Sequence, residues 1–143
     1  MKLATIGYER ETQATVIGRL QAAGVEVVID VRAVASSRRA GFSKTLLAAS
    51  LNDAGIGYVH LRQLGTPKPG RIAVRKGHVG EMHEIFKAHM AEAAAQVELA
   101  KATELARDRK VALLCYEADA QACHRSIVAD RICEVLGCEI ENL

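Results

Sequence analysis

The sequence predicts one α/β domain over residues 1–143, built on a doubly wound, mostly parallel sheet of about five strands with helices on both faces. Two apolar runs, Val27-Val28-Ile29 and Val111-Ala112-Leu113-Leu114, do not alternate with polar residues, as is typical of parallel strands covered on both sides. Segments with apolar residues at helical spacing separate the strands. Hydrophobic residues make up 50% of the chain but aromatic residues only 3%, which favours regular packed elements over a small aromatic-rich barrel.

In the first half of the chain, strand-like and helix-like segments alternate. We expect strands at residues 2–6, 25–31 and 56–61, and helices at residues 12–23 and 43–54. Thr12 and Ser43 are typical N-cap residues. Gly24 and Gly55 directly follow the two helices, at the position where glycine most often ends a helix.

The second half of the chain is expected to complete the sheet. Residues 65–77 contain both prolines and no acidic residue, which predicts a long surface loop. Residues 78–109 have apolar side chains every three or four positions, over a length that suits a kinked helix or two helices. We then expect a buried strand at residues 111–116, a helix at 119–136 and an edge strand at 138–143.

Positive charge is concentrated in the middle of the chain, although the net charge is only +2. Residues 31–80 hold nine Lys or Arg residues and one acidic residue, Asp53, whereas the rest of the chain holds ten basic and sixteen acidic residues. Such segregation predicts an anionic partner, either a small phosphate-containing molecule or a nucleic acid. The alternative is a solvated basic surface without a partner.

The cysteines and the distribution of apolar residues bear on the surroundings of the protein. The N-terminal residues lack the features of a signal peptide, and no apolar run reaches membrane length, so we expect a cytoplasmic protein with no membrane partner. In that compartment the four cysteines are expected to be thiols rather than a disulfide framework. Cys133 and Cys138 fall at core-like positions and are interpreted as small buried hydrophobes.

The stretch from Cys115 to Arg125 concentrates reactive side chains on one strand-to-helix turn. In open α/β sheets, ligands bind outside the carboxyl ends of the strands, so this turn lies where a site is expected. The candidate catalytic residues are Cys115, Glu117, Cys123 and His124. We interpret one of the two cysteines as a nucleophile, His124 as a proton carrier, and Glu117 as its orienting group or base. Cys123 is expected in the first helical turn, where the helix dipole would lower the pKa of its thiol. The alternative for Cys115 is an unreactive thiol buried in the core.

The same edge of the sheet is expected to collect residues that bind a ligand. Tyr8, Asp30, Arg32 and His60 each lie at or just after the end of an expected strand, and Arg38 belongs to a basic loop. We therefore interpret these five residues as ligand-binding, with the arginines as anion binders.

Arg125 is predicted by helical spacing to lie near the start of the last helix, on the face that packs against the sheet. A positive side chain in the first turn opposes the helix dipole, so we expect it to bind an anion held there. The alternative is a structural ion pair with Asp30 or Glu117.

Three classes of function fit these features. The leading one is an enzyme-like domain, a thiol-dependent transferase or hydrolase that binds a small anionic or nucleotide-derived ligand. The second is a non-catalytic nucleic-acid-binding module, although the chain has few aromatic residues and no recognisable nucleic-acid motif. The third is a metal-binding domain with ligands from Cys115, Glu117, Cys123 and His124. It is disfavoured because their spacing is not the paired pattern of structural zinc sites, and because Cys123 and His124, as neighbours on a helix, would point about 100° apart. We expect neither a metal ion nor another cofactor.

Four blocks of residues along the chain carry a likeness to a known family: Thr5-Ile6-Gly7-Tyr8-Glu9; Asp30-Val31-Arg32 with Ser37-Arg38 and Phe42; Gly55-Ile56 with Tyr58, His60, Leu64 and Gly65; and Cys115-Tyr116-Glu117 with Cys123-His124-Arg125. Over nearly its whole length the chain resembles the domain of unknown function 488 family. It departs from that family's pattern at Ala35, where proline is usual, and at Thr66, where a second glycine is common. The resemblance implies the fold and the site rather than an activity, and it adds Tyr58 to the expected ligand-binding residues.

A weaker resemblance concerns rhodanese-like sulfurtransferases. The run Asp30-Val31-Arg32 at a strand end, together with a later strand that ends in Cys115 before a helix, is similar to those domains. The turn after Cys115 is long and contains no glycine, which differs from a tight loop that cradles an anion, so this likeness is an analogy of fold.

Overall fold

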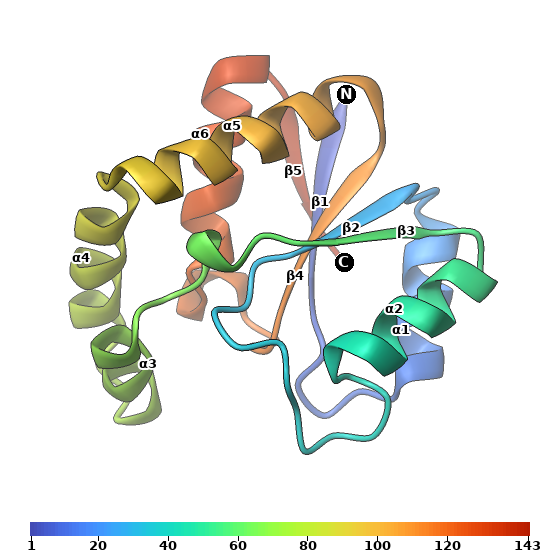
Figure 1. The fold of residues 1–143 in the computed structure, drawn as a ribbon, viewed down its shortest axis with the longest axis horizontal. Helices are drawn as coiled ribbons and strands as arrows, with labels where there is room; N and C mark the ends of the chain where they lie inside the picture. Colours follow the sequence, from blue (N-terminus) through green and yellow to red (C-terminus); the bar gives the residue numbers. More distant parts are fainter.

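The computed structural model describes the whole chain, residues 1–143, and contains one five-stranded sheet in which all strands are parallel. The strands are β1 (Lys2–Gly7), β2 (Val27–Asp30), β3 (Gly57–His60), β4 (Val111–Cys115) and β5 (Glu139–Asn142). They lie in the order β3-β2-β4-β1-β5, with β3 and β5 at the edges (Figure 1). The expected α/β fold is confirmed, and the sheet is parallel throughout.

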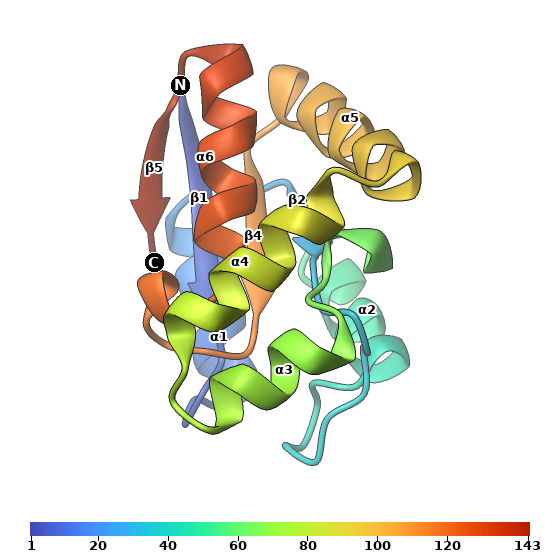
Figure 2. The ribbon, with the colours of Figure 1, turned by 90° about the vertical axis from the view of Figure 1, so that its left-hand side faces the viewer.

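Six α-helices cover the two faces of this sheet (Figures 1 and 2). One face is covered by α1 (Gln13–Ala22) and α2 (Lys44–Asp53). The other face is covered by α3 (Lys68–Arg75), α4 (Val79–Met90), α5 (Ala93–Asp108) and α6 (Arg125–Leu136). Two short 3-10 helices, η1 (Arg62–Leu64) and η2 (Ala120–Ala122), lie in the connections. None of the helices has the length and apolar character that spanning a membrane requires.

The core forms two layers because the central strands are buried on both sides. Along β2, Val28 packs into the layer beneath α1 and α2, whereas its neighbour Ile29 packs into the layer beneath the other helices. Every residue of β4 is buried, as its run of apolar residues predicts. The strand that carries Cys115 at its end is therefore packed from both faces of the sheet.

The segment at residues 65–77 differs from the expected surface loop, because most of it forms the helix α3. Pro67 precedes the helix and Pro69 lies in its first turn, where a missing N–H leaves no hydrogen bond unmade. Gly77 follows the helix with φ of +78°, a conformation that favours glycine. The two prolines therefore start a helix here rather than break one, and the loop prediction was wrong.

The helical pattern over residues 78–109 is divided between α4 and α5, which was one of the two expected outcomes. The break falls at Ala91 and Glu92, and the side-chain amide of Gln96 donates to the carbonyl oxygen of Met90 across it. α4 consequently turns away from α5 and packs beside α3, over the carboxyl end of the sheet (Figure 2).

The last helix begins six residues later than expected. Asp119 accepts a hydrogen bond from the Gln121 N–H with its side chain, which favours a short 3-10 turn at Ala120–Ala122. Cys123 is then extended, with φ of −123° and ψ of 146°, and α6 starts only at Arg125. The expected position of Cys123 in a first helical turn is therefore wrong.

The two cysteines at the end of the chain are joined, contrary to the expectation that all four are thiols. Cys133 and Cys138 form a disulfide, while Cys115 and Cys123 are free. Gly137 lies between the joined residues with φ of +67° and reverses the chain at the end of α6, which brings the two Cα atoms to 4.7 Å. The disulfide fastens the end of α6 to the start of β5.

Candidate functional site

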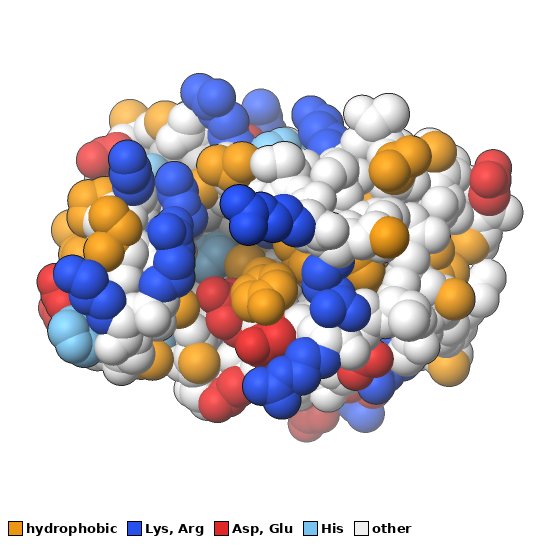
Figure 3. Space-filling view, turned by 90° about the horizontal axis from the view of Figure 1, so that it is seen from below, with side chains coloured by type: hydrophobic (Ala, Val, Ile, Leu, Met, Phe, Trp, Pro, Cys, Tyr) orange, Lys and Arg blue, Asp and Glu red, His pale blue; other side chains and the backbone are white.

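The carboxyl end of the sheet is hollowed by a cavity of about 850 Å³. Its wall is formed by the ends of β1 and β4, the loop after β2, α3 and the start of α4. Figure 3 views the molecule from this side and shows Lys and Arg side chains on both sides of the hollow, with acidic side chains below it. The expected place for a site is thus occupied by a concave surface of mixed charge.

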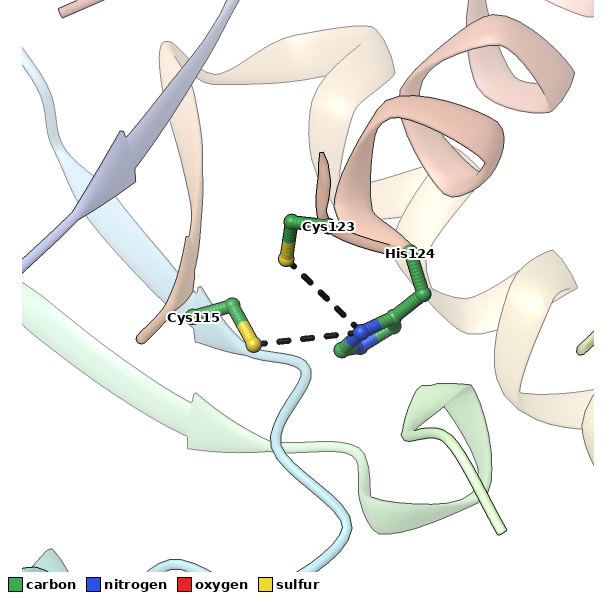
Figure 4. Close-up of side chains that lie close together, drawn as sticks. All are labelled: Cys115, Cys123 and His124. Carbon is green, nitrogen blue, oxygen red and sulfur yellow. Dashed lines mark hydrogen bonds between the residues drawn. The ribbon is translucent and has the colours of Figure 1, made fainter. Parts of the chain in front are cut away.

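Two thiols and an imidazole converge beside the cavity (Figure 4), and Cys115 and His124 form part of its wall. Nδ1 of His124 lies 3.8 Å from Sγ of Cys115 and 3.7 Å from Sγ of Cys123. On the other side of the ring, Nε2 lies 2.7 Å from the carbonyl oxygen of Val31. Because that oxygen can only accept, Nε2 carries a proton and donates it, and Nδ1 is directed at the two sulfur atoms. The Phe86 ring, 5.0 Å away between centroids, packs against the imidazole.

The convergence depends on the local backbone. Cys123 is extended and precedes α6, whereas His124 is the residue at the helix N-cap. Neighbours on a helix would diverge by about 100°, but this change of conformation between the two residues allows both side chains to face Cys115. The geometric objection raised by the sequence is therefore removed by the structure.

The two thiols have opposite electrostatic surroundings. Interaction with Cys123, followed by burial, raises the pKa of Cys115 well above its ordinary value. Burial opposes charge on Cys123 as well, but the Cys115 S–H group and the positive His124 and Arg125 side chains outweigh it and hold the pKa of Cys123 well below its ordinary value. Cys115 borders the cavity, whereas Cys123 is only 1% exposed and does not. The thiol that a ligand can reach is thus not the acidic one.

Glu117 and His124 complete a set of interacting ionisable groups. Oε2 of Glu117 lies 3.7 Å from Sγ of Cys115, and both residues border the cavity. Burial and the charge of Cys123 raise the pKa of Glu117 to about 7. Burial lowers the pKa of His124, but the charge of Cys123 and the hydrogen bond to Val31 raise it overall. A carboxyl group able to give or take a proton therefore lies beside the sulfur atoms.

Three arginines border the cavity without carboxylate partners. Arg38 comes from the loop after β2, and Arg71 and Arg75 lie one turn apart on α3. None of the three forms an ion pair, although Arg71 donates to the carbonyl oxygen of Thr66 at 2.9 Å. Their charge is left for whatever occupies the cavity.

Several residues expected to bind a ligand are instead bonded to one another. The carboxylate of Asp30 is fully buried and accepts from Nε and Nη2 of Arg32 at 2.9 and 2.7 Å, and from the Tyr58 hydroxyl. Nη1 of Arg32 donates to the Tyr8 hydroxyl at 3.0 Å and to the carbonyl oxygen of Phe42 at 2.7 Å. Tyr8 and Arg32 border the cavity, but Asp30 and Tyr58 lie behind it. This network fixes the loop after β2.

His60 belongs to the same network and also lies outside the cavity wall. Its Nε2 is 2.7 Å from the carbonyl oxygen of Arg32, so the ring donates to the backbone where β2 ends. The residue supports the loop rather than facing the cavity.

Arg125 is buried, with 1% of its surface exposed, and does not border the cavity. Its guanidinium donates to the carbonyl oxygens of Glu117 and Ala118. It therefore bonds neither the carboxylate of Asp30 nor that of Glu117, the two ion pairs considered from the sequence. Arg125 therefore acts as a clamp: its two hydrogen bonds hold the backbone of the turn that carries Glu117.

A family model described as "Domain of unknown function DUF488" matches residues 12–132. The chain belongs to the DUF488 family. The matched segment contains the whole Cys115–Cys123–His124 cluster and all three free arginines. No curated protein and no solved structure matches the chain, and the likeness to rhodanese-like domains is not supported.

Sequence reasoning missed part of the cavity wall of this DUF488 domain. Arg71 and Arg75 were counted as loop charges, because the helix α3 was not recognised. The available signal was a proline at each side of the helix start and a glycine after its end. Glu9 was also overlooked as a support: its carboxylate accepts from the Ala118 N–H at 3.0 Å and so holds the turn from the side of β1.

Proposed function

We propose that this DUF488 domain is an enzyme that binds a small anionic molecule at the carboxyl end of the sheet and transforms it at the Cys115–Cys123–His124 cluster. The observation that carries the proposal is the composition of a single cavity wall, which joins Cys115 and His124 of that cluster to arginines without carboxylate partners. A group held by the arginines would place the remainder of the molecule against the cluster. Transferase and hydrolase chemistry both fit a sulfur, imidazole and carboxyl set.

The arginines support an anionic ligand of modest size. A guanidinium binds phosphate or carboxylate through two parallel hydrogen bonds, and Arg71 and Arg75 present two such groups from one face of α3. The volume of about 850 Å³ lies within the range of roughly 300–1,000 Å³ that is usual for small-molecule sites. A nucleotide-derived molecule or another phosphate ester fits both features.

A small ligand is favoured over a nucleic acid because the basic residues do not form one free surface. Arg32 is bonded to Asp30, and Arg39 donates to the carbonyl oxygen of Glu11 at 2.6 and 3.1 Å. Some of the basic side chains counted in the sequence are therefore bonded within the fold and are not available to a nucleic acid. Arg71 and Arg75, by contrast, face a hollow too small for a duplex.

Glu117 is assigned to proton transfer. Its carboxyl group borders the cavity beside Cys115, so it lies within reach of a group that reacts at the cluster. The clamp by Arg125 and the support from Glu9 hold its backbone on both sides. A catalytic carboxyl group needs such fixed positioning.

Binding is tested by thermal unfolding in the presence of inorganic phosphate. Phosphate should raise the melting temperature of the natural protein, because it binds only the folded state, and should do so less for the variant Arg71→Ala/Arg75→Ala. Lys76→Ala is the matched control, since Lys76 lies next to Arg75 but does not border the cavity. Equal stabilisation of all three proteins would contradict anion binding by these arginines.

Turnover is tested with a panel of small phosphate esters and carboxylic esters and amides. Any activity of the natural protein should be lost in Glu117→Gln, while stabilisation by phosphate is retained. An activity that survives both Glu117→Gln and His124→Ala would place the chemistry elsewhere.

A further inference from the structure

We propose that Cys115, Cys123 and His124 bind one divalent transition-metal ion of the zinc class, with a fourth coordination position that opens to the cavity. Binding of the ion depends only on these three side chains. The use of the open position rests on the proposed function, because it assigns a mode of action to the cluster that borders the anion site.

The spacing of the three ligand atoms fits a tetrahedral site. The two sulfur atoms and Nδ1 of His124 lie within 4.8 Å of one another, with sulfur–nitrogen distances of 3.8 and 3.7 Å. In tetrahedral zinc sites, bonds of about 2.3 Å to sulfur and 2.0–2.1 Å to nitrogen separate these atoms by about 3.6 Å. The ion therefore needs an adjustment of only a few tenths of an ångström in these two distances. The two sulfur atoms, which lie within 4.8 Å of each other, would have to approach to the roughly 3.8 Å that tetrahedral bonds of this length require.

The imidazole is already held in the orientation of a metal ligand. Nε2 donates to the carbonyl oxygen of Val31, which leaves Nδ1 as the nitrogen that can bind an ion, with its lone pair free once its own proton is released. The lone pair is directed at the space between the two sulfur atoms (Figure 4). The Phe86 ring packs against the imidazole and limits its rotation. A ligand histidine in a protein site is usually oriented by a hydrogen bond of this kind.

Charge and burial also favour an ion. Cys115, Cys123 and His124 are at most 5% exposed, yet they place two thiols and an imidazole beside the Glu117 carboxyl group. Two thiolates around a dication carry no net charge, so the ion allows both sulfurs to be deprotonated without leaving charge in a buried place. These two cysteines are free, whereas the other pair in the chain forms a disulfide.

The fourth position distinguishes a catalytic from a structural site. Structural zinc sites are closed by four protein ligands, whereas catalytic ones use three and leave a position for water or substrate. Here three residues converge, and two of them, Cys115 and His124, border the cavity. A water molecule on the ion would lie toward the anion site, close to Glu117.

The site therefore suits hydrolysis of the bound anionic molecule. Glu117 takes a proton from the metal-bound water, and the resulting hydroxide attacks the electrophilic carbon or phosphorus atom of the substrate. The bond to the leaving group breaks, and Glu117 returns the proton to that group. One water molecule is consumed, and no electron donor or acceptor is required.

The experiment is metal analysis of the full chain, purified under reducing conditions without chelator and then loaded with Zn²⁺. The expected result is about one ion per chain for the natural protein and less than roughly a tenth of that for Cys123→Ser. The double variant Cys133→Ala/Cys138→Ala is the matched control. It loses one cysteine more than Cys123→Ser, but it should bind as much Zn²⁺ as the natural protein.

Co²⁺ titration of the natural protein provides a readout that needs no variant. Binding should produce the intense near-ultraviolet absorption of thiolate-to-cobalt charge transfer and the visible bands of tetrahedral Co²⁺. Excess Zn²⁺ should abolish both. Reduced, folded protein that shows no charge-transfer absorption and retains no Zn²⁺ would overturn the proposal.

Failure of the metal site and failure of the anion site give different results. If the metal proposal alone fails, phosphate still stabilises the chain in a manner that depends on Arg71 and Arg75, but neither Zn²⁺ nor Co²⁺ binds. If the anion site alone fails, the chain binds one Zn²⁺ ion and phosphate leaves its melting temperature unchanged.

Discussion

Cys115 and Cys123 both contact the same imidazole nitrogen: Nδ1 of His124 lies 3.8 Å from Sγ of Cys115 and 3.7 Å from Sγ of Cys123. Cys115 ends a fully buried strand, whereas Cys123 is extended and lies two residues before the start of α6. Neither thiol can gain or lose a proton without changing the surroundings of the other. The chemistry of this site therefore belongs to the pair and its histidine rather than to either cysteine alone.

The buried pair of Asp30 and Arg32 should be essential for stability. Asp30→Asn leaves the Arg32 guanidinium buried without a counter-charge, and we expect a loss of about 3–5 kcal/mol in the free energy of unfolding, measured with urea. Glu104→Gln makes the same chemical change in an exposed helical pair with Arg107 and should cost only about 0.3–0.5 kcal/mol. If Asp30→Asn lowers the free energy of unfolding by as little as Glu104→Gln does, the Asp30 network does not stabilise the fold.

The fold was predictable because its determinants are local and repeated. The apolar runs of β2 and β4 require cover on both faces, and that requirement leads to a parallel sheet with helices on either side. The position of Cys115 at the carboxyl end of β4 follows from the same pattern. The sequence therefore placed the cluster at the correct edge of the sheet.

The side-chain arrangement was less predictable because it depends on contacts between distant segments. Arg32 and Asp30 have the residue types of ligand binders, and only the approach of Tyr8, Phe42 and Tyr58 shows that they are bonded within the fold. The extended backbone at Cys123 likewise depends on a short 3-10 turn whose signal is weak. Residue type thus predicted where the reactive side chains lie together, but not which of them are bonded within the fold.

Gly7 should tolerate no side chain, because the turn after β4 lies directly against it. A Cβ atom at this position would overlap the carbonyl oxygen of Glu117. We expect Gly7→Ala to lower the free energy of unfolding by about 1–3 kcal/mol, as overpacking does, and to displace Glu117. Gly18→Ala, in the middle of α1 with open space around it, should instead stabilise the protein by up to about 1 kcal/mol. Urea unfolding of both variants measures this difference in sign, and a stable Gly7→Ala protein would contradict the close approach.

Tyr58 should make the fold sensitive to alkaline pH. Burial, and then the hydrogen bond to the Asp30 carboxylate, raises the pKa of Tyr58 well above its ordinary value of about 10. A raised pKa in the folded state means that the contribution to stability is complete below about pH 10 and is lost as the pH rises further. As the pH rises from about 9 to 11, the free energy of unfolding should therefore fall less for Tyr58→Phe than for the natural protein.

The control for this pH dependence is Tyr116→Phe, which changes a tyrosine that is 44% exposed. Its stability, measured by urea unfolding at each pH, should fall as steeply as that of the natural protein. If Tyr58→Phe also falls as steeply, the hydroxyl of Tyr58 does not remain protonated in the folded state as the network requires.

Arg125 provides the clearest separation between a structural and a ligand-binding role. Because its guanidinium donates to the carbonyl oxygens of Glu117 and Ala118 from a buried position, Arg125→Ala should cost about 3 kcal/mol of unfolding free energy. Arg125→Lys should recover only part of this loss, since an ammonium group cannot reproduce the two-armed geometry. The exposed Arg109→Ala is the control for loss of charge, and urea unfolding gives the free energy of unfolding of each variant.

Phosphate should still raise the melting temperature of Arg125→Lys, because the arginines without carboxylate partners lie elsewhere, on the cavity wall. A variant that keeps its stability but loses the response to phosphate would return Arg125 to the anion-binding role that its helical spacing suggested.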